Sequence, residues 1–187
     1  MNKILDITTY QPKADDKFLL DANIWLYLYC PLGNYRQTVI QGYDGFLKKA
    51  IGIKASIWVS SLVLSEVINR WLRLDFGIYR KLHKNKNMDF KGDYRPTAKC
   101  KGLSQNIAAI IETKMFQVAG RINDNFSGID SSSILNNLAD NDFNDLYYSK
   151  LANTNKLVIV TDDADFGSIP LPVTILTGNP KLLRNNP

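Results

Sequence analysis

Five acidic residues stand near the ends of the chain's apolar segments. Asp21 closes the apolar run KFLLD, and Asp163 follows the apolar run LVIVT. Glu66 lies in an apolar stretch of helical period, while Asp142 and Asp145 are three residues apart and share one face of a helix. Carboxylate oxygens are the hard ligands that Mg²⁺ and Mn²⁺ prefer, together with water and substrate phosphates. The acidic residues therefore predict a site for one or two Mg²⁺ or Mn²⁺ ions.

Such a site suits the hydrolysis of a phosphodiester bond. The negative oxygens of the phosphodiester repel a nucleophile, and a bound cation both offsets that charge and lowers the pKa of a bound water. The chain contains one histidine, His83, so a ribonuclease mechanism that uses two histidines is excluded. Metal dependence is the more economical interpretation.

Each acidic residue also has a purely structural explanation. Asp21 and Asp163 are good helix N-caps, and Asp142 resembles the start of a capping box. Glu66 can pair with Arg70 at helical i,i+4 spacing, which contributes only about 0.3 to 0.5 kcal/mol. These separate explanations do not predict that all of the acids meet at one edge of a sheet.

The elements that must bring them together alternate between strand and helix. We expect strands at 17–21, 57–60, 157–161 and 173–176, and helices at 22–30, 35–49, 61–73, 104–118, 130–137 and 141–153, with a tail at 178–187. This alternation predicts a three-layer α/β/α fold with a mostly parallel central sheet, in a single domain over 1–187. In such sheets ligands bind beyond the carboxyl ends of the strands, where Asp21 and Asp163 should lie.

Charge is distributed unevenly along the chain, whose net charge is +5. Residues 79–101 hold eight Lys or Arg against two Asp, and residues 140–166 hold six Asp against two Lys. We expect an insertion at about 77–104, with a long loop at 83–101, and its charge favours contact with a polyanion. The residues predicted to bind RNA are Lys84, Lys86, Lys91 and Arg95, with Tyr79, Phe90 and Tyr94 available to stack on bases. The alternative is a solvated loop without a ligand.

Several other classes of protein are excluded by the composition. The two cysteines are too few for a disulfide scaffold and have no zinc-binding spacing. No apolar run is long enough to span a bilayer, and residues 1–10 have no apolar signal segment, so we expect a cytoplasmic protein without membrane contact. No Gly-x-Gly-x-x-Gly motif follows a predicted strand, which argues against a dinucleotide-binding enzyme.

Three segments carry a resemblance to a known family. They are DANIW at 21–25, SSLVLSEVINRW at 60–71 and NDLYYSKLANTNKLVIVTDDADF at 144–166. Together they resemble the PIN-domain nucleases and, within them, the VapC-like toxins of type II bacterial toxin–antitoxin pairs. The matching positions are Asp21 and Asn23, then Glu66, then Asp145, and finally Thr161, Asp163, Asp165 and Phe166.

The resemblance implies a PIN-like fold and a Mg²⁺- or Mn²⁺-dependent endoribonuclease that cleaves single-stranded RNA, as the toxin of such a pair. It assigns the catalytic and metal-binding roles to Asp21, Glu66, Asp145 and Asp163, and supporting roles to Asn23, Asp142, Thr161 and Asp165. It also implies an antitoxin protein as partner and a homodimer. This chain departs from the small toxins in its length, its basic insertion and the bulky Tyr147 and Tyr148.

Two other functions fit parts of the pattern. A catalytically inactive PIN-like protein that binds RNA or acts as a scaffold keeps the same fold, although it has no need for four costly carboxylates at one edge. A phosphotransfer enzyme of the haloacid-dehalogenase or receiver type also has an Asp after its first strand. The former needs a second Asp where this chain has Asn23, and the latter needs a Lys after a late strand.

Overall fold

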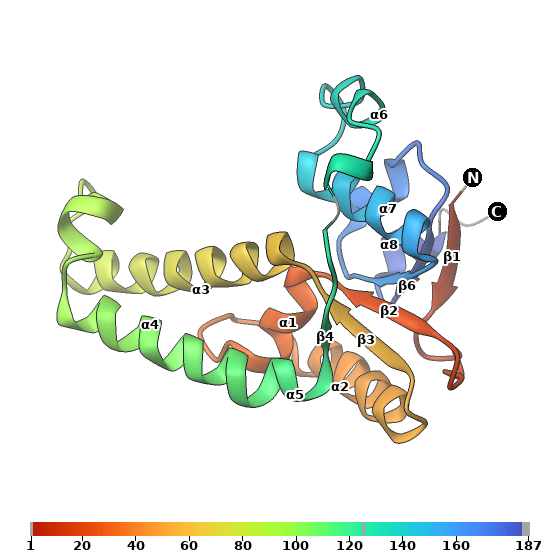
Figure 1. Ribbon diagram of the computed structural model, residues 1–187. Helices are drawn as coiled ribbons and strands as arrows, with labels where there is room; N and C mark the ends of the chain where they lie inside the picture. Colours follow the sequence, from red (N-terminus) through yellow and green to blue (C-terminus); the bar gives the residue numbers. More distant parts are fainter. Residues whose placement is uncertain (1, 125, 185–187) are drawn as a thin grey trace.

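The computed structural model describes residues 2–124 and 126–184, and within them the chain forms one six-stranded sheet (Figure 1). Every strand pair is parallel, and the strand order is β1-β6-β5-β2-β3-β4. The strands are β1 (Lys3–Asp6), β2 (Lys17–Leu20), β3 (Ser56–Val59), β4 (Gly120–Arg121), β5 (Val158–Val160) and β6 (Thr174–Thr177). The predicted parallel sheet is therefore confirmed.

Strands β2 and β5 lie at the centre of this sheet and pair directly with each other. Phe18 and Leu20 of β2 are fully buried, as is Val160 of β5. Strands of a parallel sheet are covered on both faces, which explains why these segments are apolar without alternation. Their register sets Leu20 beside Val160, so the residues that follow each strand emerge next to each other.

Helices cover both faces of the sheet, as the three-layer prediction requires. Figure 1 shows α1 and α2 on one side of β2 and β3 and α7 on the other. The helices are α1 (Ala22–Tyr29), α2 (Gln37–Gly52), α3 (Ser61–Leu82), α4 (Ala98–Ile110), α5 (Phe116–Val118), α6 (Ser132–Leu135), α7 (Phe143–Asn155) and α8 (Pro180–Arg184). Among the described helices, none combines the length and the apolar character needed to cross a bilayer.

Three short elements were not expected from the sequence. Strand β1 buries only Ile4 strongly, and β4 has two exposed residues, so neither carries a periodic apolar signal. Gly120 of β4 passes so close to the Trp58 ring that a Cβ atom there would lie 2.8 Å from it. The predicted tail at 178–187 is wrong over α8, and residues 185–187 lie outside the described part of the chain.

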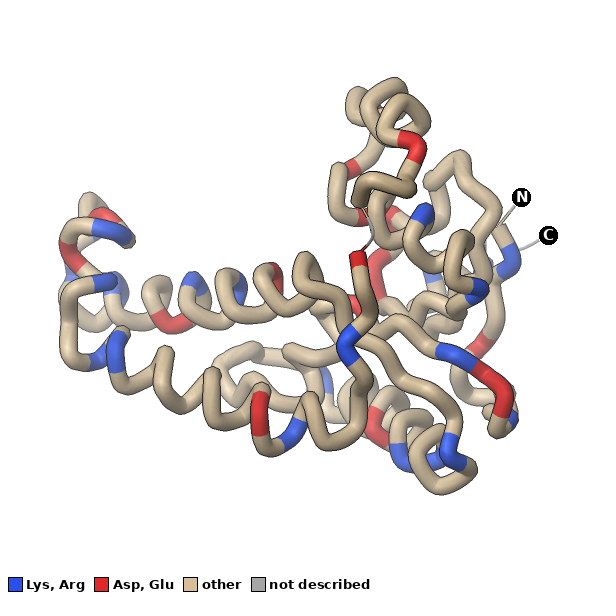
Figure 2. The backbone as a smooth tube through the Cα atoms, viewed as in Figure 1, with Lys and Arg blue, Asp and Glu red and all other residues tan. Residues whose placement is uncertain are grey.

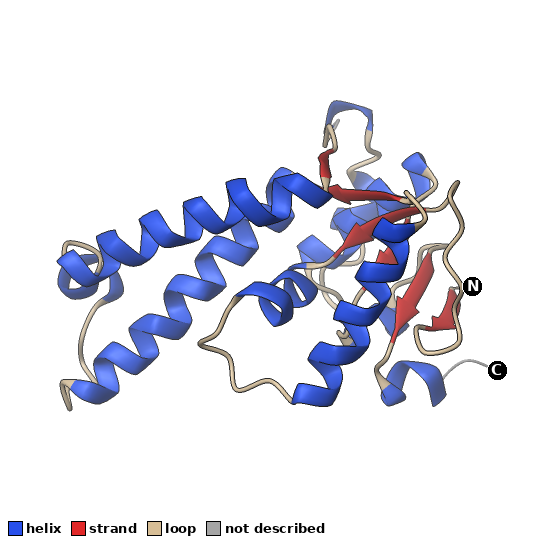
Figure 3. Cartoon of the chain, turned by 90° about the horizontal axis from the view of Figure 1, so that it is seen from below, coloured by secondary structure: helices blue, strands red, loops and turns tan. Residues whose placement is uncertain are grey.

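The predicted loop at 83–101 is wrong in part, because this segment forms the end of a helical hairpin. Residues 90–94 and 98–101 are helical, whereas residues 83–89 and 95–97 form turns and loop. Helix α3 continues to Leu82, a π-helical turn η1 spans Phe90–Tyr94, and α4 returns from Ala98. Figures 1 and 3 both show α3 and α4 projecting together from the sheet. Because α4 starts at Ala98, the expected helix at 104–118 begins six residues earlier than the periodicity indicated.

A small core of its own stabilises the end of the hairpin. The Tyr94 hydroxyl donates a hydrogen bond of 2.5 Å to Asp75 Oδ2, and Lys99 Nζ lies 3.2 Å from Asp75 Oδ1. The Phe76 ring packs edge-on against Phe90, with 5.4 Å between the ring centroids. Phe90 and Tyr94 are buried, so the prediction that they stack on RNA bases is wrong. Their polar neighbours in the sequence concealed this packing.

Candidate active site

Asp21 lies at the carboxyl end of β2, where it is also the N-cap of α1. Its Oδ1 accepts a hydrogen bond of 2.5 Å from the Ala22 N–H, so the predicted capping role is real. Its Oδ2 accepts from Asn23 Nδ2 at 2.6 Å and from Thr161 Oγ1 at 2.7 Å. The side chain is only 5% exposed, and these donors hold it in one orientation.

Thr161 and Asn23 join the end of β5 to the start of α1. Asn23 Nδ2 lies 3.1 Å from Thr161 Oγ1, and that hydroxyl oxygen accepts a 3.0 Å hydrogen bond from the Asp163 N–H. Asp163 is the N-cap of a 3-10 turn over Ala164–Ser168, and its Oδ1 accepts from the Asp165 N–H at 3.1 Å. The two positions predicted to support the site therefore link Asp21 to Asp163 directly.

Glu66 reaches toward the same place from the second turn of α3, whose N-cap is Ser60. Its Oε1 lies 3.2 Å from Arg70, which is the helix pair expected from the spacing. Its Oε2 accepts hydrogen bonds from the Tyr148 hydroxyl at 3.1 Å and from Asn144 Nδ2 at 3.4 Å, both on α7. Glu66 therefore faces α7 across the sheet edge and is not merely paired along its own helix.

Asp145 and Asp142 lie at the start of α7 in different surroundings. Asp142 is exposed and caps the helix, because its Oδ1 accepts a 2.8 Å hydrogen bond from the Asn144 N–H. Asp145 lies in the first turn and is partly buried. The structure thus fits the capping explanation for Asp142, whereas the Asp145 carboxylate accepts no hydrogen bond from the described residues that would explain its burial.

Electrostatics shows that the four main acids share one space. The pKa of Asp21 is raised to about 7, first by burial and then by the negative charges of Glu66 and Asp163, while the hydrogen bonds from Thr161 and Ala22 oppose the rise. The pKa of Asp145 is raised to about 8, first by burial and then by the negative charges of Asp21, Asp163, Asp142 and Glu66. Such mutual effects require nearby like charges. We refer to Asp21, Glu66, Asp145 and Asp163 as the acidic cluster.

The donor chemistry of the acidic cluster fits a divalent cation. Its side chains offer carboxylate oxygens alone, the hard donors that Mg²⁺ and Mn²⁺ prefer. Over residues 2–124 and 126–184, no group of three or more His, Cys, Asp or Glu side chains is drawn together closely enough to hold a metal ion. The two findings agree, because charges interact over longer distances than ligands bind, and like-charged carboxylates stay apart until a cation offsets them.

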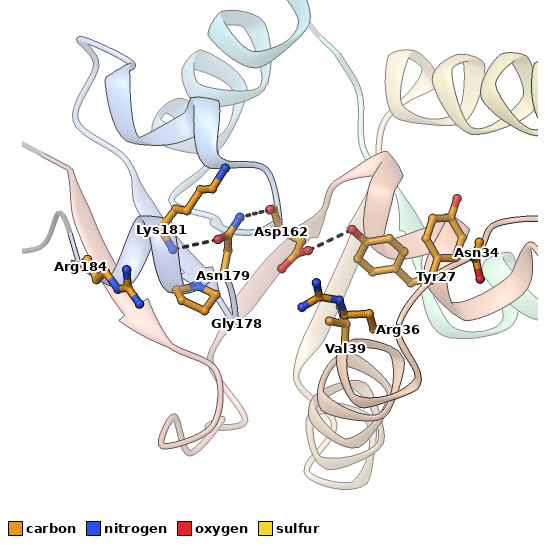
Figure 4. A pocket seen from close by; sticks show the side chains of 11 residues that line it. Tyr27, Asn34, Arg36, Val39, Asp162, Gly178, Asn179, Lys181 and Arg184 are labelled. Carbon is orange, nitrogen blue, oxygen red and sulfur yellow. Dashed lines mark hydrogen bonds between the residues drawn. The ribbon is translucent and has the colours of Figure 1, made fainter.

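A pocket that the sequence did not reveal adjoins the acidic cluster. Asp162, which stands between Thr161 and Asp163, turns its side chain toward α1 and α2, where its carboxylate accepts hydrogen bonds from Tyr27 at 3.0 Å and Tyr43 at 2.8 Å. It lines a pocket of about 490 Å³ (Figure 4). No pattern in the sequence distinguishes Asp162 beyond its place among the acids, and the other walls come from segments predicted to be helix or tail.

The predicted RNA-binding residues lie far from the acidic cluster. Lys84, Lys86, Lys91 and Arg95 are all exposed at the free end of the hairpin, and Figure 2 shows the basic segments gathered there. We refer to these four residues as the basic tip. Arg80, Lys81, Lys84 and Lys86 also line a cavity of about 640 Å³. At 1.5 Å per helical residue, the distance along α3 from Glu66 to Leu82 is about 24 Å.

Comparison with known proteins gives one structural match of interest. No protein-family model matches the chain, and no curated protein sequence is similar to it. Among solved structures, the chain is similar to a chain of the crystal structure of VapBC2 from Rickettsia felis bound to a DNA fragment from their promoter. The sequence identity is 17%, the match covers 86% of this chain and 98% of that chain, and the TM-score is 0.49. A match at this level is a similarity of chain path and assigns no activity.

Proposed function

We propose that the protein is a Mg²⁺- or Mn²⁺-dependent endoribonuclease that cleaves single-stranded RNA. The observation that carries the proposal is the acidic cluster, in which four carboxylates from four separate elements share one partly buried space. Two of them have raised pKa values, so keeping them charged at neutral pH costs folding free energy. A fold that retains this cost has a use for a bound cation.

The chain's own residues have distinct tasks in this proposal. Asp21, Glu66, Asp145 and Asp163 would hold the cation, which would supply an activated water and offset charge on the phosphate. Asn23 and Thr161 hold Asp21 in place by hydrogen bonds of 2.6 and 2.7 Å. Tyr148 orients Glu66 from α7. Asp142 and Asp165 add negative charge nearby, and the charge of Asp142 raises the pKa of Asp145.

The basic tip supplies the electrostatic attraction for RNA. Exposed Lys and Arg release the counterions of a polyanion, a contribution that depends on salt and not on sequence. Because the tip lies about 24 Å from Glu66 along α3, it contacts nucleotides some distance from the cleaved bond. RNA that reaches both ends of the hairpin is single-stranded or locally unpaired.

The biological setting follows from the motif resemblance alone. It favours a toxin that acts in the cytoplasm, is blocked by an antitoxin protein and assembles as a homodimer. These assignments, and the extent of the domain over 1–187, stay predictions.

The experiment that tests the function is cleavage of a mixed single-stranded RNA by the purified protein with Mg²⁺, Mn²⁺ or EDTA. We expect cleavage by wild type with either metal, and none with EDTA or with Asp21→Asn. Asp140→Asn is the matched control, because Asp140 is an exposed acid two residues before Asp142 and outside the acidic cluster. This control should cleave as wild type does.

A different result would favour the non-enzymatic alternative. Wild type that binds RNA but leaves it intact with every metal, after removal of any co-purified inhibitor, would make the chain an RNA-binding or scaffold protein. Cleavage by Asp21→Asn at the wild-type rate would refute the assignment of the acidic cluster.

A further inference from the structure

The pocket beside the acidic cluster has the composition of an anion site. Its walls carry three cations, Arg36 at the start of α2 and Lys181 and Arg184 on α8, against the single carboxylate of Asp162. None of the three cations forms an ion pair with a residue in the described part of the chain. Their charges are therefore unmatched within the fold and available to a ligand.

The carboxylate oxygens of Asp162 already have hydrogen-bond donors inside the protein. Each of its carboxylate oxygens accepts a hydrogen bond from a tyrosine hydroxyl, from Tyr27 to Oδ2 and from Tyr43 to Oδ1. Asn179 Nδ2 also donates to its backbone carbonyl at 2.6 Å and fixes the loop before α8 against the end of β5. Asp162 forms no ion pair with Arg36, Lys181 or Arg184, so all three cations remain available to an anion from outside.

Two tyrosine rings give the pocket an aromatic wall. Tyr27 and Tyr35 pack edge-on with 4.6 Å between the ring centroids, and both line the pocket. The Tyr35 ring lies directly over Gly33, where a Cβ atom would overlap it. Both rings are partly exposed, so a flat base can pack against them.

Position connects the pocket to the acidic cluster. Asp162 lies in the pocket, while its two sequence neighbours belong to the site, Thr161 through its bond to Asp21 and Asp163 as a cluster member. Figure 4 shows Arg36 on the side of α2, and Asn179, Lys181 and Arg184 on the side of α8, with Asp162 between the two sides. Asp162 is one residue along the chain from both Thr161 and Asp163, which places the pocket beside the acidic cluster.

We propose that this pocket is a nucleotide subsite, in which Arg36, Lys181 and Arg184 bind a phosphate of single-stranded RNA and Tyr35 packs against the adjoining base. The proposal rests on the proposed function, since it places the subsite next to the cleaved bond. A volume of about 490 Å³ suits one nucleotide, because pockets for small ligands are about 300 to 1,000 Å³. The pocket also explains how RNA approaches four carboxylates that repel it.

Binding to the pocket needs no metal, so it is measured apart from cleavage. The probe is a fluorescein-labelled eight-nucleotide single-stranded RNA, followed by fluorescence anisotropy in EDTA at several salt concentrations. We expect Arg36→Gln/Arg184→Gln to bind about tenfold or more weakly, with a salt slope shallower by about 0.7, since both arginines contact one phosphate and the loss of one phosphate contact removes about 0.7. The matched control is Lys49→Gln/Lys114→Gln, which removes two exposed charges far from the pocket in sequence and should bind as wild type does.

A second variant separates base packing from charge. Tyr35→Ala should bind the RNA about five- to tenfold more weakly with an unchanged salt slope, because it removes a ring and no charge. Tyr35→Phe keeps the ring and should retain wild-type affinity, since the Tyr35 hydroxyl forms no hydrogen bond with a described residue. Thermal unfolding of each variant shows whether it is folded at the temperature of the assay.

The outcomes separate this subsite from the nuclease proposal. If the arginine variant binds as tightly as the lysine control, the pocket is not a nucleotide subsite, even when wild type cleaves RNA. If wild type shows the expected binding differences but never cleaves, the subsite stands and the nuclease proposal fails. Equal binding by Tyr35→Ala and wild type would overturn the base contact.

Discussion

The acidic cluster and the basic tip differ in how the chain builds them. The acidic cluster draws on Asp21, Glu66, Asp145 and Asp163, which are separated by up to 142 residues and meet only because the sheet is parallel. The basic tip comes from one continuous segment whose charged residues all point outward from a local aromatic core.

The two regions also differ in whether their functional side chains are buried. In the acidic cluster, the functional side chains themselves are buried and repel each other, which raises the pKa values of Asp21 and Asp145. In the basic tip, the cations remain in water and the buried pair of Tyr94 and Asp75 stabilises the scaffold beneath them. Substitutions in the acidic cluster should therefore lower activity without lowering stability. Substitutions of the exposed cations in the basic tip should weaken RNA binding without lowering stability, and substitutions in the core beneath them should lower stability.

The largest effect should come from removing a carboxylate of the acidic cluster. Asp145→Asn and Glu66→Gln should each lower the rate of metal-dependent RNA cleavage by about a thousandfold or more, since a cation's contribution amounts to several kcal/mol. Their thermal midpoints without metal should equal or exceed that of wild type, because repulsion is relieved. If both variants cleave RNA at a rate within tenfold of wild type, the acidic cluster is not the site of catalysis.

The pH dependence of stability sharpens the same contrast. Asp21 has a folded pKa of about 7, above its ordinary value of 3.8, so the folded state prefers the protonated form. Stability from this group is present below about pH 4 and is lost as the pH rises through 7. In EDTA, the free energy of unfolding of Asp21→Asn minus that of wild type should increase by about 2 to 4 kcal/mol from pH 4.5 to pH 8. A difference between the two proteins that stays constant across this pH range would contradict the prediction.

In the hairpin, a conservative change should affect stability and leave chemistry intact. Tyr94→Phe removes the donor to buried Asp75 and should lower the free energy of unfolding by about 1 to 3 kcal/mol. Tyr79→Phe is the control, because the Tyr79 hydroxyl has no hydrogen bond to a described residue. Cleavage at saturating RNA, measured below both melting temperatures, should be unchanged. A stability equal to that of the control would mean that the buried pair contributes nothing.

The smallest effect should come from the charges of the basic tip. Lys84→Gln/Lys86→Gln/Lys91→Gln should weaken binding of a long single-stranded RNA by about tenfold and flatten its salt slope by about 2. The stability of the protein should barely change, since all three side chains are exposed. An unchanged salt slope would mean that the basic tip is a solvated surface that does not contact RNA.

The sequence predicted the sheet and the acidic cluster better than it predicted the hairpin. Central strands are continuous apolar runs, and a parallel sheet brings the residues after them to one edge, so Asp21 and Asp163 were correctly expected to meet. Their catalytic role stays a prediction. The tip was misjudged because Phe90 and Tyr94 stand among charged residues, and only the fold reveals that Asp75 provides a buried partner for Tyr94.

The pocket beside the acidic cluster was beyond prediction for a different reason. Arg36, Asp162 and Lys181 have no shared spacing or pattern, and they become neighbours only because Tyr43 and Asn179 tie α2 and α8 to the end of β5. A pattern along the sequence records periodicity within an element. It does not record which loops meet beyond a sheet.

The pairing of β1 with β6 determines when the sheet can be completed during synthesis of the chain. Lys3 pairs with Thr174, 171 residues later, and Asn2 Nδ2 donates to the Ile169 carbonyl at 3.0 Å. A ribosome that adds about 5 to 20 residues per second leaves β1 without its neighbour for roughly 10 to 30 seconds. Because Asp163 also emerges late, the nascent chain has no complete acidic cluster until Asp163 has been translated.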